Sequence, residues 1–429
     1  MNMKYRARIG WVGLLLMTLC GGTTQAENWP AFRGPTAQGI ADLPNPPIHW
    51  SATENIAWKT AIPGESWSSP IVWGNRIFLT TATDKGVSCR VICINAADGQ
   101  ILWNVEVFKQ KPTRKETQNS YATPTPIADG KNVYAFFGEG GAAAVSFDGK
   151  VLWTNTDHPF YSRHGFGASP ALYNSLLIMS YDISDPKDEK LGWVVPWNKS
   201  YILALDARTG KEAWRTPRGM SRQAHGVTRI EKIDGQMQAV TDAGDVIQGL
   251  EPQTGKVIWS IKNPGEGVVP SLVFGDGMVF ASSGFPTPIH NEKTYAAIRA
   301  FKLGGTGDIT WNLVWEEKRA VPMIPSFAFY KDMLFAVKED GMAQCLDART
   351  GKVHWRERLQ GNSYAASPII AGGKIFITSQ DALTTVLDAG PEFKELAENP
   401  INEHCQASIA VYGNHLILRT EHNLYCIGK

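Results

Sequence analysis

The sequence predicts an all-β fold, an eight-bladed β-propeller of four-stranded antiparallel blades. Three observations lead to this prediction. A short unit ending in Trp recurs along the chain, a strand-turn-strand element precedes each copy, and a spare strand near the start matches one that the last repeat lacks. Repeats of 40–50 residues built from short strands are typical of propellers.

The first observation is a turn of Asp-Gly or Thr-Gly followed, four residues after the Gly, by Trp. Copies such as ALDARTGKEAW and CLDARTGKVHW end at Trp103, Trp153, Trp214, Trp259, Trp311 and Trp355, with spacings of 50, 61, 45, 52 and 44 residues. Glycine accepts the positive φ of a tight hairpin, so each copy predicts two strands, c and d. A Trp repeated in every blade serves packing between blades, and we interpret these residues, with Trp58, as structural docking residues.

The second observation is an apolar strand, a Gly, Asn or Asp turn and another apolar strand, which predict strands a and b. This element occupies residues 68–81, 125–137, 168–180, 270–282, 325–337, 366–378 and 408–419. The seventh unit lacks its Trp, and Phe393 is the candidate substitute.

The third observation concerns ring closure. The eighth unit ends at Lys429 after its third strand, while residues 55–60, NIAWKT, resemble a fourth strand with its Trp. We therefore expect Trp58 to pack in blade eight beside Tyr425 and Cys426, which removes an open sheet edge. The predicted organisation is a signal peptide at 1–26, an N-terminal extension at 27–54 and a single propeller domain at 55–429.

The first 26 residues predict export. A basic start, an uncharged run from Ile9 to Leu19 and small residues before Ala26 form a secretory signal, too short to span a bilayer. Cleavage near Ala26 yields a protein of the periplasm or the extracellular space. Lipidation at Cys20 is the alternative, but Leu19 stands where a small residue is expected.

Charge and cysteine content narrow the class further. The formal net charge of +1 argues against nucleic-acid binding, which needs a clustered basic excess. The chain contains no CxxC and no adjacent cysteines, so buried free thiols are the favoured interpretation. A disulfide between Cys405 and Cys426 stays open.

The LDARTGK-type units resemble the tryptophan-docking repeats of quinoprotein-type (PQQ-like) propellers. That family includes PQQ-dependent alcohol dehydrogenases and the BamB-type assembly scaffold. The opening NWPAFRGP resembles exported PQQ-like repeat proteins. The resemblance implies the eight-bladed fold, and it leaves function open because a propeller hosts unrelated activities.

Propeller geometry predicts the site. Residues just before each strand a converge on one mouth of the central channel, and the long loops 183–199 and 284–294 reach the same face. The predicted ligand- or partner-binding residues are Glu65, Trp67, Tyr121, Arg163, His164, Phe166, Arg222, His225, Tyr364, Glu403 and His404. Trp193, Trp197 and His290 are the predicted lid residues. The Arg and His side chains favour an anionic partner, and no metal site is predicted.

Two functions remain open. The first is a non-catalytic, monomeric propeller that binds or scaffolds a protein, peptide or carbohydrate, without a cofactor and with no catalytic residue. The alternative is a PQQ-dependent dehydrogenase with quinone and Ca²⁺ in the channel. The chain lacks the adjacent cysteine pair common in such enzymes, and no mouth Asp matches a catalytic base.

Overall fold

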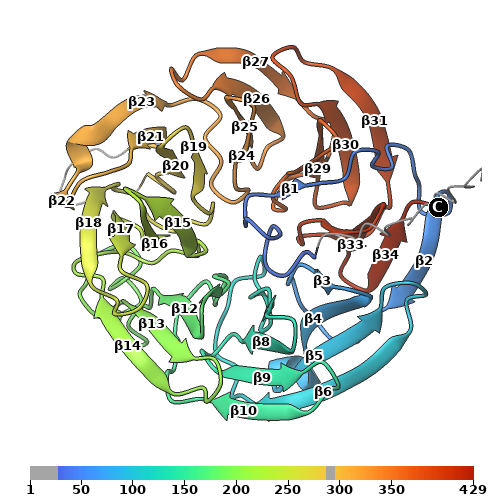
Figure 1. Cartoon of the computed structure of the whole chain (residues 1–429), viewed down its shortest axis with the longest axis horizontal. Coiled ribbons are helices and arrows are strands. Elements are labelled where there is room, and N and C mark those ends of the chain that lie inside the picture. Colours follow the sequence, from blue (N-terminus) through green and yellow to red (C-terminus); the bar gives the residue numbers. More distant parts are fainter. Residues whose placement is uncertain (1–27, 287–294) are drawn as a thin grey trace, which may run out of the picture.

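A computed structural model describes residues 28–286 and 295–429. Eight antiparallel sheets stand in a ring around a central axis (Figure 1). This confirms the predicted eight-bladed β-propeller. The proposed signal peptide and His290 lie outside the described residues. Within the described ranges, no helix is long and apolar enough to cross a membrane.

Each blade runs outward from a short inner strand to a long outer one. Blade 1 consists of β3 (Ile71–Trp73), β4 (Arg76–Thr83), β5 (Ser88–Asn95) and β6 (Ile101–Lys109), and blade 2 of β7 (Ile127–Ala128), β8 (Asn132–Phe136), β9 (Ala142–Ser146) and β10 (Val151–Asn155). Blade 3 consists of β11 (Ala171–Tyr173), β12 (Leu176–Tyr181), β13 (Tyr201–Asp206) and β14 (Glu212–Pro217). Blade 4 consists of β15 (Arg229–Ile233), β16 (Gln236–Asp242), β17 (Val246–Leu250) and β18 (Val257–Lys262).

Blades 5 to 8 repeat this order. Blade 5 consists of β19 (Val273–Gly275), β20 (Met278–Ser282), β21 (Ile298–Lys302) and β23 (Leu313–Glu317), and blade 6 of β24 (Ala328–Tyr330), β25 (Met333–Val337), β26 (Met342–Asp347) and β27 (Val353–Arg358). Blade 7 consists of β28 (Ile369–Ala371), β29 (Lys374–Thr378), β30 (Leu383–Asp388) and β31 (Glu395–Pro400). Blade 8 consists of β32 (Ala410–Tyr412), β33 (His415–Arg419), β34 (Asn423–Ile427) and β2 (Ile56–Ala61). Two 3-10 turns, η1 (Asp84–Gly86) and η2 (Thr310–Asn312), interrupt the strands.

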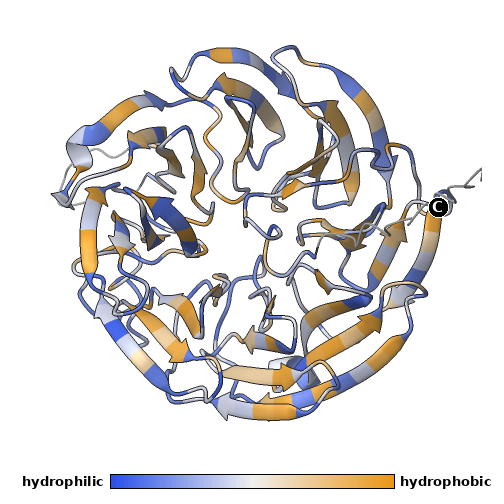
Figure 2. Ribbon diagram, viewed as in Figure 1, coloured by the Kyte–Doolittle hydropathy of each residue, from blue (hydrophilic) through white to orange (hydrophobic). Residues whose placement is uncertain are grey.

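Burial follows the position of a strand in its blade. The second strand β12 is buried along its whole length, whereas the outer strand β10 alternates between half-buried and exposed residues. The inner strands are covered on both faces by neighbouring blades, and the outer strands face water on one side. Apolar residues accordingly concentrate on the strands, and many connecting loops are polar (Figure 2).

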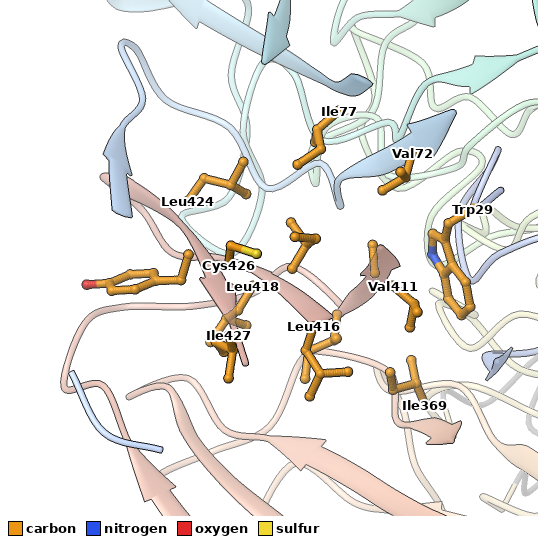
Figure 3. Packing of buried hydrophobic residues seen from close by; sticks show 14 of the residues in the cluster. Trp29, Val72, Ile77, Ile369, Val411, Leu416, Leu418, Leu424, Cys426 and Ile427 are labelled. Carbon is orange, nitrogen blue, oxygen red and sulfur yellow. The ribbon is translucent and has the colours of Figure 1, made fainter. Parts of the chain in front are cut away.

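The N-terminal strand closes the ring as predicted. β2 pairs antiparallel with β34, with Trp58 opposite Cys426 and Lys59 opposite Tyr425. The largest apolar cluster lies at this seam and joins Val72 of blade 1, Leu416 of blade 8 and Ile369 of blade 7 (Figure 3). The first and last blades are therefore held by both a backbone ladder and a shared core.

Six docking tryptophans donate their indole N–H to a backbone carbonyl of the next blade. They are Trp58, Trp103, Trp153, Trp214, Trp315 and Trp355. The receiving turn needs glycine, because a Cβ on Gly210 (φ +72°) would lie 2.4 Å from the ring of Trp153. These six carry the contact that the repeat predicts.

Two predicted docking residues behave differently. The prediction that Trp311 is the docking residue of blade 5 is wrong, because Trp311 lies in η2 with 80% of its surface exposed. Trp315 makes the docking contact instead. Trp259 is fully buried but turns into its own blade, where its indole N–H donates to Gln238. Phe393 packs against Trp355 and so belongs to the blade 6–7 seam, not to the next one.

The seam between blades 4 and 5 is held together by an added strand. The connection from β21 to β23 adds the short strand β22 (Gly307–Asp308) in parallel to the outer strand β18, with Trp259 opposite Gly307. The backbone N–H of Ile309 also donates to Ser260. This extra strand stands where the cross-blade tryptophan is missing.

The N-terminal extension enters the ring instead of lying outside it. β1 (Ile40–Ala41) pairs in parallel with the inner strand β28 near the centre of the ring (Figure 1). Trp29 bridges Val72, and the side chain of Gln38 accepts a hydrogen bond from the Phe274 N–H. These contacts lie at or near the distal ends of strands a, so the extension closes the channel opposite the mouth.

The described cysteines are all buried and free: Cys89, Cys93, Cys345, Cys405 and Cys426. The favoured interpretation is thus confirmed, and the disulfide between Cys405 and Cys426 does not form in this structure. Burial raises the pKa of the Cys405 thiol to about 12, so it stays protonated.

Candidate functional site

A cavity of about 360 Å³ occupies the channel at the mouth formed by the loops that lead into strands a. Residues from all eight blades line it, and Phe32 of the extension joins them from the closed side. This volume falls near the lower end of the roughly 300–1,000 Å³ typical of small-molecule sites. The cavity is therefore a blind pocket and not an open passage.

A ring of hydroxyls forms the wall. In seven blades the residue two positions before strand a is Ser or Thr, and its oxygen accepts the backbone N–H of the corresponding residue in the preceding blade. Written from the residue that donates its backbone N–H to the residue whose hydroxyl accepts it, the bonds are Ser69 to Thr125, Thr125 to Ser169, Val227 to Ser271, Ser271 to Ser326, Ser326 to Ser367, Ser367 to Ser408 and Ser408 to Ser69. Their lengths are 2.9–3.2 Å.

Blade 4 interrupts this ring. Val227 occupies the position, and the Ser169 N–H makes no hydrogen bond with any described residue. The hydroxyl ring was not predicted, although its signal is present in the sequence. A Ser or Thr recurs at the start of the strand a copies, as in SSPIV, ASPAL and PSFAF.

Aromatic side chains stand at the mouth. Trp67, Trp193 and Phe285 line the cavity from blades 1, 3 and 5. Trp193 is held by the Arg163 guanidinium, 4.5 Å from its ring centre, and by the edge of His164 at 5.3 Å. His404 meets Trp67 edge-on at 5.1 Å. These contacts fix the orientation of two indoles.

The histidines of the cavity are neutral at pH 7. Burial, with a smaller contribution from His164, lowers the pKa of His225 to about 3. Burial also lowers the pKa of His164. Within the described part of the chain, two fully buried side-chain nitrogens of cavity residues have no hydrogen-bond partner, Trp67 Nε1 and His225 Nδ1.

Ion pairs tie the loops around the mouth together. Arg163 Nε lies 3.2 Å from Glu116, and Arg114 lies 3.5 Å from Glu189 in the long blade 3 loop. The Tyr161 hydroxyl donates to the same Glu189 at 2.6 Å. Arg163 and Arg114 are thus balanced by acidic neighbours, which removes much of the basis for an anionic partner.

Four of the predicted residues line the cavity: Trp67, His164, His225 and Trp193. Arg163 and His404 stand behind the two tryptophans. The cavity also contains polar residues that were not predicted as site residues, among them Glu116, Gln118, Asn119 and Gln406. Glu116, Gln118 and Asn119 come from the loop between blades 1 and 2, which also contains the predicted Tyr121, but no sequence signal showed which of its side chains face the cavity.

Three predicted residues are buried elsewhere, and the expectation that they face the cavity is wrong. Phe166 stacks on Phe160 at 4.0 Å inside the blade 2–3 core. Tyr364 is fully buried, and its hydroxyl accepts the Gly361 N–H at 2.9 Å. Arg222 is buried against Asp245 at 2.7 Å. Their backbones are at the mouth, but their side chains turn inward.

The remaining predicted residues also lie off the cavity wall. Glu65 pairs with Lys115 at 3.2 Å, and Glu403 pairs with Lys59 at 2.9 Å beside β34. The Tyr121 hydroxyl donates to Thr113, and the Trp197 indole donates to Ser200. All four serve contacts between loops and strands.

A buried charge cluster lies behind the wall. Arg218 forms an ion pair with Asp182 at 2.9 Å, both fully buried, and donates to the backbone carbonyl of Asp242. Both Asp242 carboxyl oxygens lack a partner among the described residues, and burial raises the pKa of this group to about 7. A Cβ on Gly226 would lie 2.0 Å from this carboxyl, so Gly226 makes room for it beside His225.

The lining does not fit a calcium-bound quinone. Ca²⁺ takes six to eight oxygen ligands, whereas the described residues that line the cavity include two carboxylates, Glu116 and Glu266, and no Asp. Across residues 28–286 and 295–429, no three His, Cys, Asp or Glu side chains gather as a metal site.

The fold and its docking tryptophans define a propeller of the PQQ-like class. A model of the family described as "Outer membrane protein assembly factor BamB" matches residues 46–161, 198–328 and 297–420. The chain therefore belongs to this family, which confirms the resemblance of its repeats.

Curated relatives are distant. Tetrathionate hydrolase of Acidithiobacillus ferrooxidans is 21% identical over 377 residues, covering 76% of this chain and 65% of that protein. Polyvinylalcohol dehydrogenase of Pseudomonas sp is 25% identical over 266 residues, covering 60% of this chain and 35% of that protein. The chain spans less than two thirds of the length of either relative.

Solved structures share the fold. BamB from Moraxella catarrhalis matches with a TM-score of 0.59 and 13% identity, over 87% of this chain and 97% of that one. A europium-containing methanol dehydrogenase matches with a TM-score of 0.65 and 10% identity, over 94% and 98%. One neighbour is an assembly factor and the other an enzyme, so the fold alone does not choose between them.

Proposed function

We propose that the chain is an exported, non-catalytic binding propeller, which holds part of a protein, peptide or carbohydrate partner in its channel-mouth cavity. The observation that carries this proposal is the construction of the cavity. It is blind and walled by hydroxyls, and it is faced by indoles whose orientations are fixed by neighbouring side chains. Pre-formed apolar pockets with a few converging polar groups are typical of binding sites.

Export is part of the proposal, and it is supported by the signal pattern of residues 1–26. Membership in a family described by an assembly factor is consistent with a role in binding rather than in chemistry. A place in cell-envelope assembly follows as one form of this proposal.

A PQQ-dependent dehydrogenase is the second candidate, and the match to polyvinylalcohol dehydrogenase favours it. Purified chain lacking residues 1–26 should be mixed with PQQ and Ca²⁺, then with alcohols and an artificial electron acceptor. We expect no shift in melting temperature and no turnover above a denatured control. Turnover that a chelator abolishes would overturn the binding propeller.

The binding role itself is tested by capture. The full chain and its Trp67→Ala/Trp193→Ala variant, each immobilised, should be exposed to the exported fraction of the source cells. The same partner should be retained by the parent chain and lost by the variant, because both indoles face the cavity. Equal retention by both would place binding outside the mouth.

A further inference from the structure

We infer that the cavity recognises the terminal residue of an uncharged glycan. This inference rests on the proposed function, because it names the ligand class of the same site. Four features carry it: unused hydrogen-bond donors on the wall, no free cation among the described lining residues, aromatic faces at the mouth and a closed far end.

The wall presents a surplus of donors. Each ring hydroxyl accepts a backbone N–H from the preceding blade, so its oxygen is occupied from behind. A hydroxyl also carries one hydrogen to donate. For the seven ring residues, no hydrogen bond donated by this hydroxyl occurs within the described part of the chain. A ring of O–H groups therefore stands ready at the cavity surface.

The mouth adds to this surplus. Trp67 Nε1 can only donate, and it has no acceptor among the described residues. His225 Nδ1 is likewise without a partner, and its ring is neutral. Both nitrogens are buried, and a buried polar atom without a partner costs free energy, so a small rotation of either ring that brings its nitrogen to a ligand oxygen is favoured.

The charges exclude an anion as the preferred ligand. Arg163, the guanidinium nearest Trp193, lies 3.2 Å from the Glu116 carboxylate. Both cavity histidines have lowered pKa values and are uncharged at pH 7. An anionic ligand would lose its hydration at this site without meeting a free cation among the described residues that line it. An oxygen-rich, uncharged ligand matches the wall better.

The aromatic residues select for flat apolar faces. Trp67, Trp193 and Phe285 stand around the entrance, and Phe32 lines the closed side. Indole rings offer rigid apolar area at low entropic cost. A pyranose ring has both the C–H faces that pack on such rings and the oxygens that the hydroxyl ring can reach.

The closed end determines how a glycan would enter. The extension pairs with β28 and bridges Val72, so the channel does not let a polymer pass through. A volume of about 360 Å³ leaves room for the end of a chain and not for an internal stretch. We therefore expect end-on recognition.

Calorimetric titration of the full chain tests this inference. The probes are neutral tetrasaccharides (cellotetraose, xylotetraose, maltotetraose and N,N′,N″,N‴-tetraacetylchitotetraose) and, as the anionic match, tetragalacturonate. At least one neutral probe should bind, and tetragalacturonate should bind at least tenfold more weakly. The disaccharide of the best series should retain most of the affinity, because only the terminus enters.

Variants locate the binding. Trp67→Phe keeps an aromatic ring and removes the unpaired indole N–H, and Ser326→Ala/Ser367→Ala removes two ring hydroxyls. Each variant should lower the affinity for the best neutral probe at least tenfold. Ser146→Ala, in the blade 2 hairpin away from the cavity, is the control and should change nothing. Trp67→Phe removes no hydrogen bond that the described residues make, so it tests the site even where the serine variant loses stability.

Several results would overturn the inference. Preference for tetragalacturonate would show that the ligand is anionic, and unchanged affinity in both variants would show that the sugar binds elsewhere. No binding by any neutral probe would also overturn it. In that case the proposed binding role is decided separately by whether the Trp67→Ala/Trp193→Ala variant loses its captured partner.

Discussion

The backbone N–H of Ser408 in blade 8 donates to the hydroxyl of Ser69 in blade 1 over 3.0 Å. This bond joins the last inner strand to the first, at the seam that β2 closes on the outside. The same position, two residues before strand a, supplies the hydroxyl in every blade but the fourth. The cavity wall is thus a product of the repeat itself.

Completing this ring should stabilise the protein. Val227→Thr keeps the shape of the side chain and offers an oxygen to the Ser169 N–H. A hydrogen bond of this kind contributes about 0.5–1.5 kcal/mol, so the free energy of unfolding in urea should rise by that amount. Val269→Thr is the control, since Val269 lines the cavity outside the ring and its hydroxyl should bring no gain. Equal effects of both changes would contradict the prediction.

Of the two tryptophans of blade 5, only the buried Trp315 should contribute to the free energy of unfolding. Trp315→Ala removes a buried ring that donates to Ala348 of blade 6, and it should cost about 3–5 kcal/mol of unfolding free energy. Trp311→Ala removes an exposed ring and should stay within about 0.5 kcal/mol. Trp355→Ala, in blade 6, should behave like Trp315→Ala. Chemical denaturation of the three variants measures this, and a large loss for Trp311→Ala would refute the assignment.

These residues show how far the repeat pattern predicts the fold. Blade number, blade boundaries and closure by Trp58 follow from recurrence alone, because each blade must present the same surfaces to its neighbours. Trp311 satisfies the same spacing from Gly307, yet the GGTG stretch diverts this connection into β22. A spacing is measured along the chain, so it cannot reveal that a segment has joined another sheet.

The site was predictable in part for a related reason. Strand a starts converge wherever the chain forms a propeller, so the mouth could be located from the sequence. Side-chain direction could not, and Phe166 and Tyr364 point into the core from mouth positions. The hydroxyl ring needed the inter-blade register, because each oxygen serves a neighbouring blade and not its own.

Ring closure should determine solubility. Deleting Ile56–Ala61 leaves β34 with an unpaired edge and removes the indole that donates to Ala96 of blade 1. Exposed edges pair with other chains, so the deletion should aggregate at concentrations where the parent chain is monodisperse by light scattering. Lys59→Ala removes a half-exposed ammonium that pairs with Glu403 and lies 4.9 Å from the centre of the Tyr425 ring, but it keeps the backbone of β2, so it should leave dispersity unchanged. A monodisperse deletion variant with the parent melting temperature would contradict this role of β2.

The Asp242 carboxyl should make stability depend on pH. Its pKa of about 7 in the folded state lies above the ordinary value near 3.9, because burial disfavours the charged form. The folded protein therefore keeps a proton that the unfolded chain releases, and this group lowers stability as pH rises from about 4 to 7. Asp242→Asn removes that dependence.

Melting temperatures across this range measure the effect. The Asn variant should match the parent near pH 4 and exceed it at pH 8, by up to a few kcal/mol of unfolding free energy, as one pKa unit is about 1.4 kcal/mol. Asp182→Asn serves as contrast, because it breaks the buried pair with Arg218 and should destabilise at pH 8. A constant gap between Asp242→Asn and the parent at all pH values would contradict the raised pKa.

The two arginines that the sequence places at the mouth should have opposite effects when removed. Arg222 is fully buried against Asp245 at 2.7 Å, so Arg222→Ala leaves a carboxylate without its ion-pair partner and should cost about 3–5 kcal/mol of unfolding free energy. Arg163 forms a partly exposed pair with Glu116, so Arg163→Ala should cost no more than about 1 kcal/mol. Because its guanidinium covers the Trp193 ring, Arg163→Ala should instead weaken binding at the cavity while the melting temperature stays near that of the parent. Arg163→Lys, which keeps the charge but loses the planar stack, should show the same pattern more weakly. A stable Arg222→Ala variant with lost binding, or an Arg163→Ala variant with unchanged binding, would reverse the roles that the structure gives these two residues.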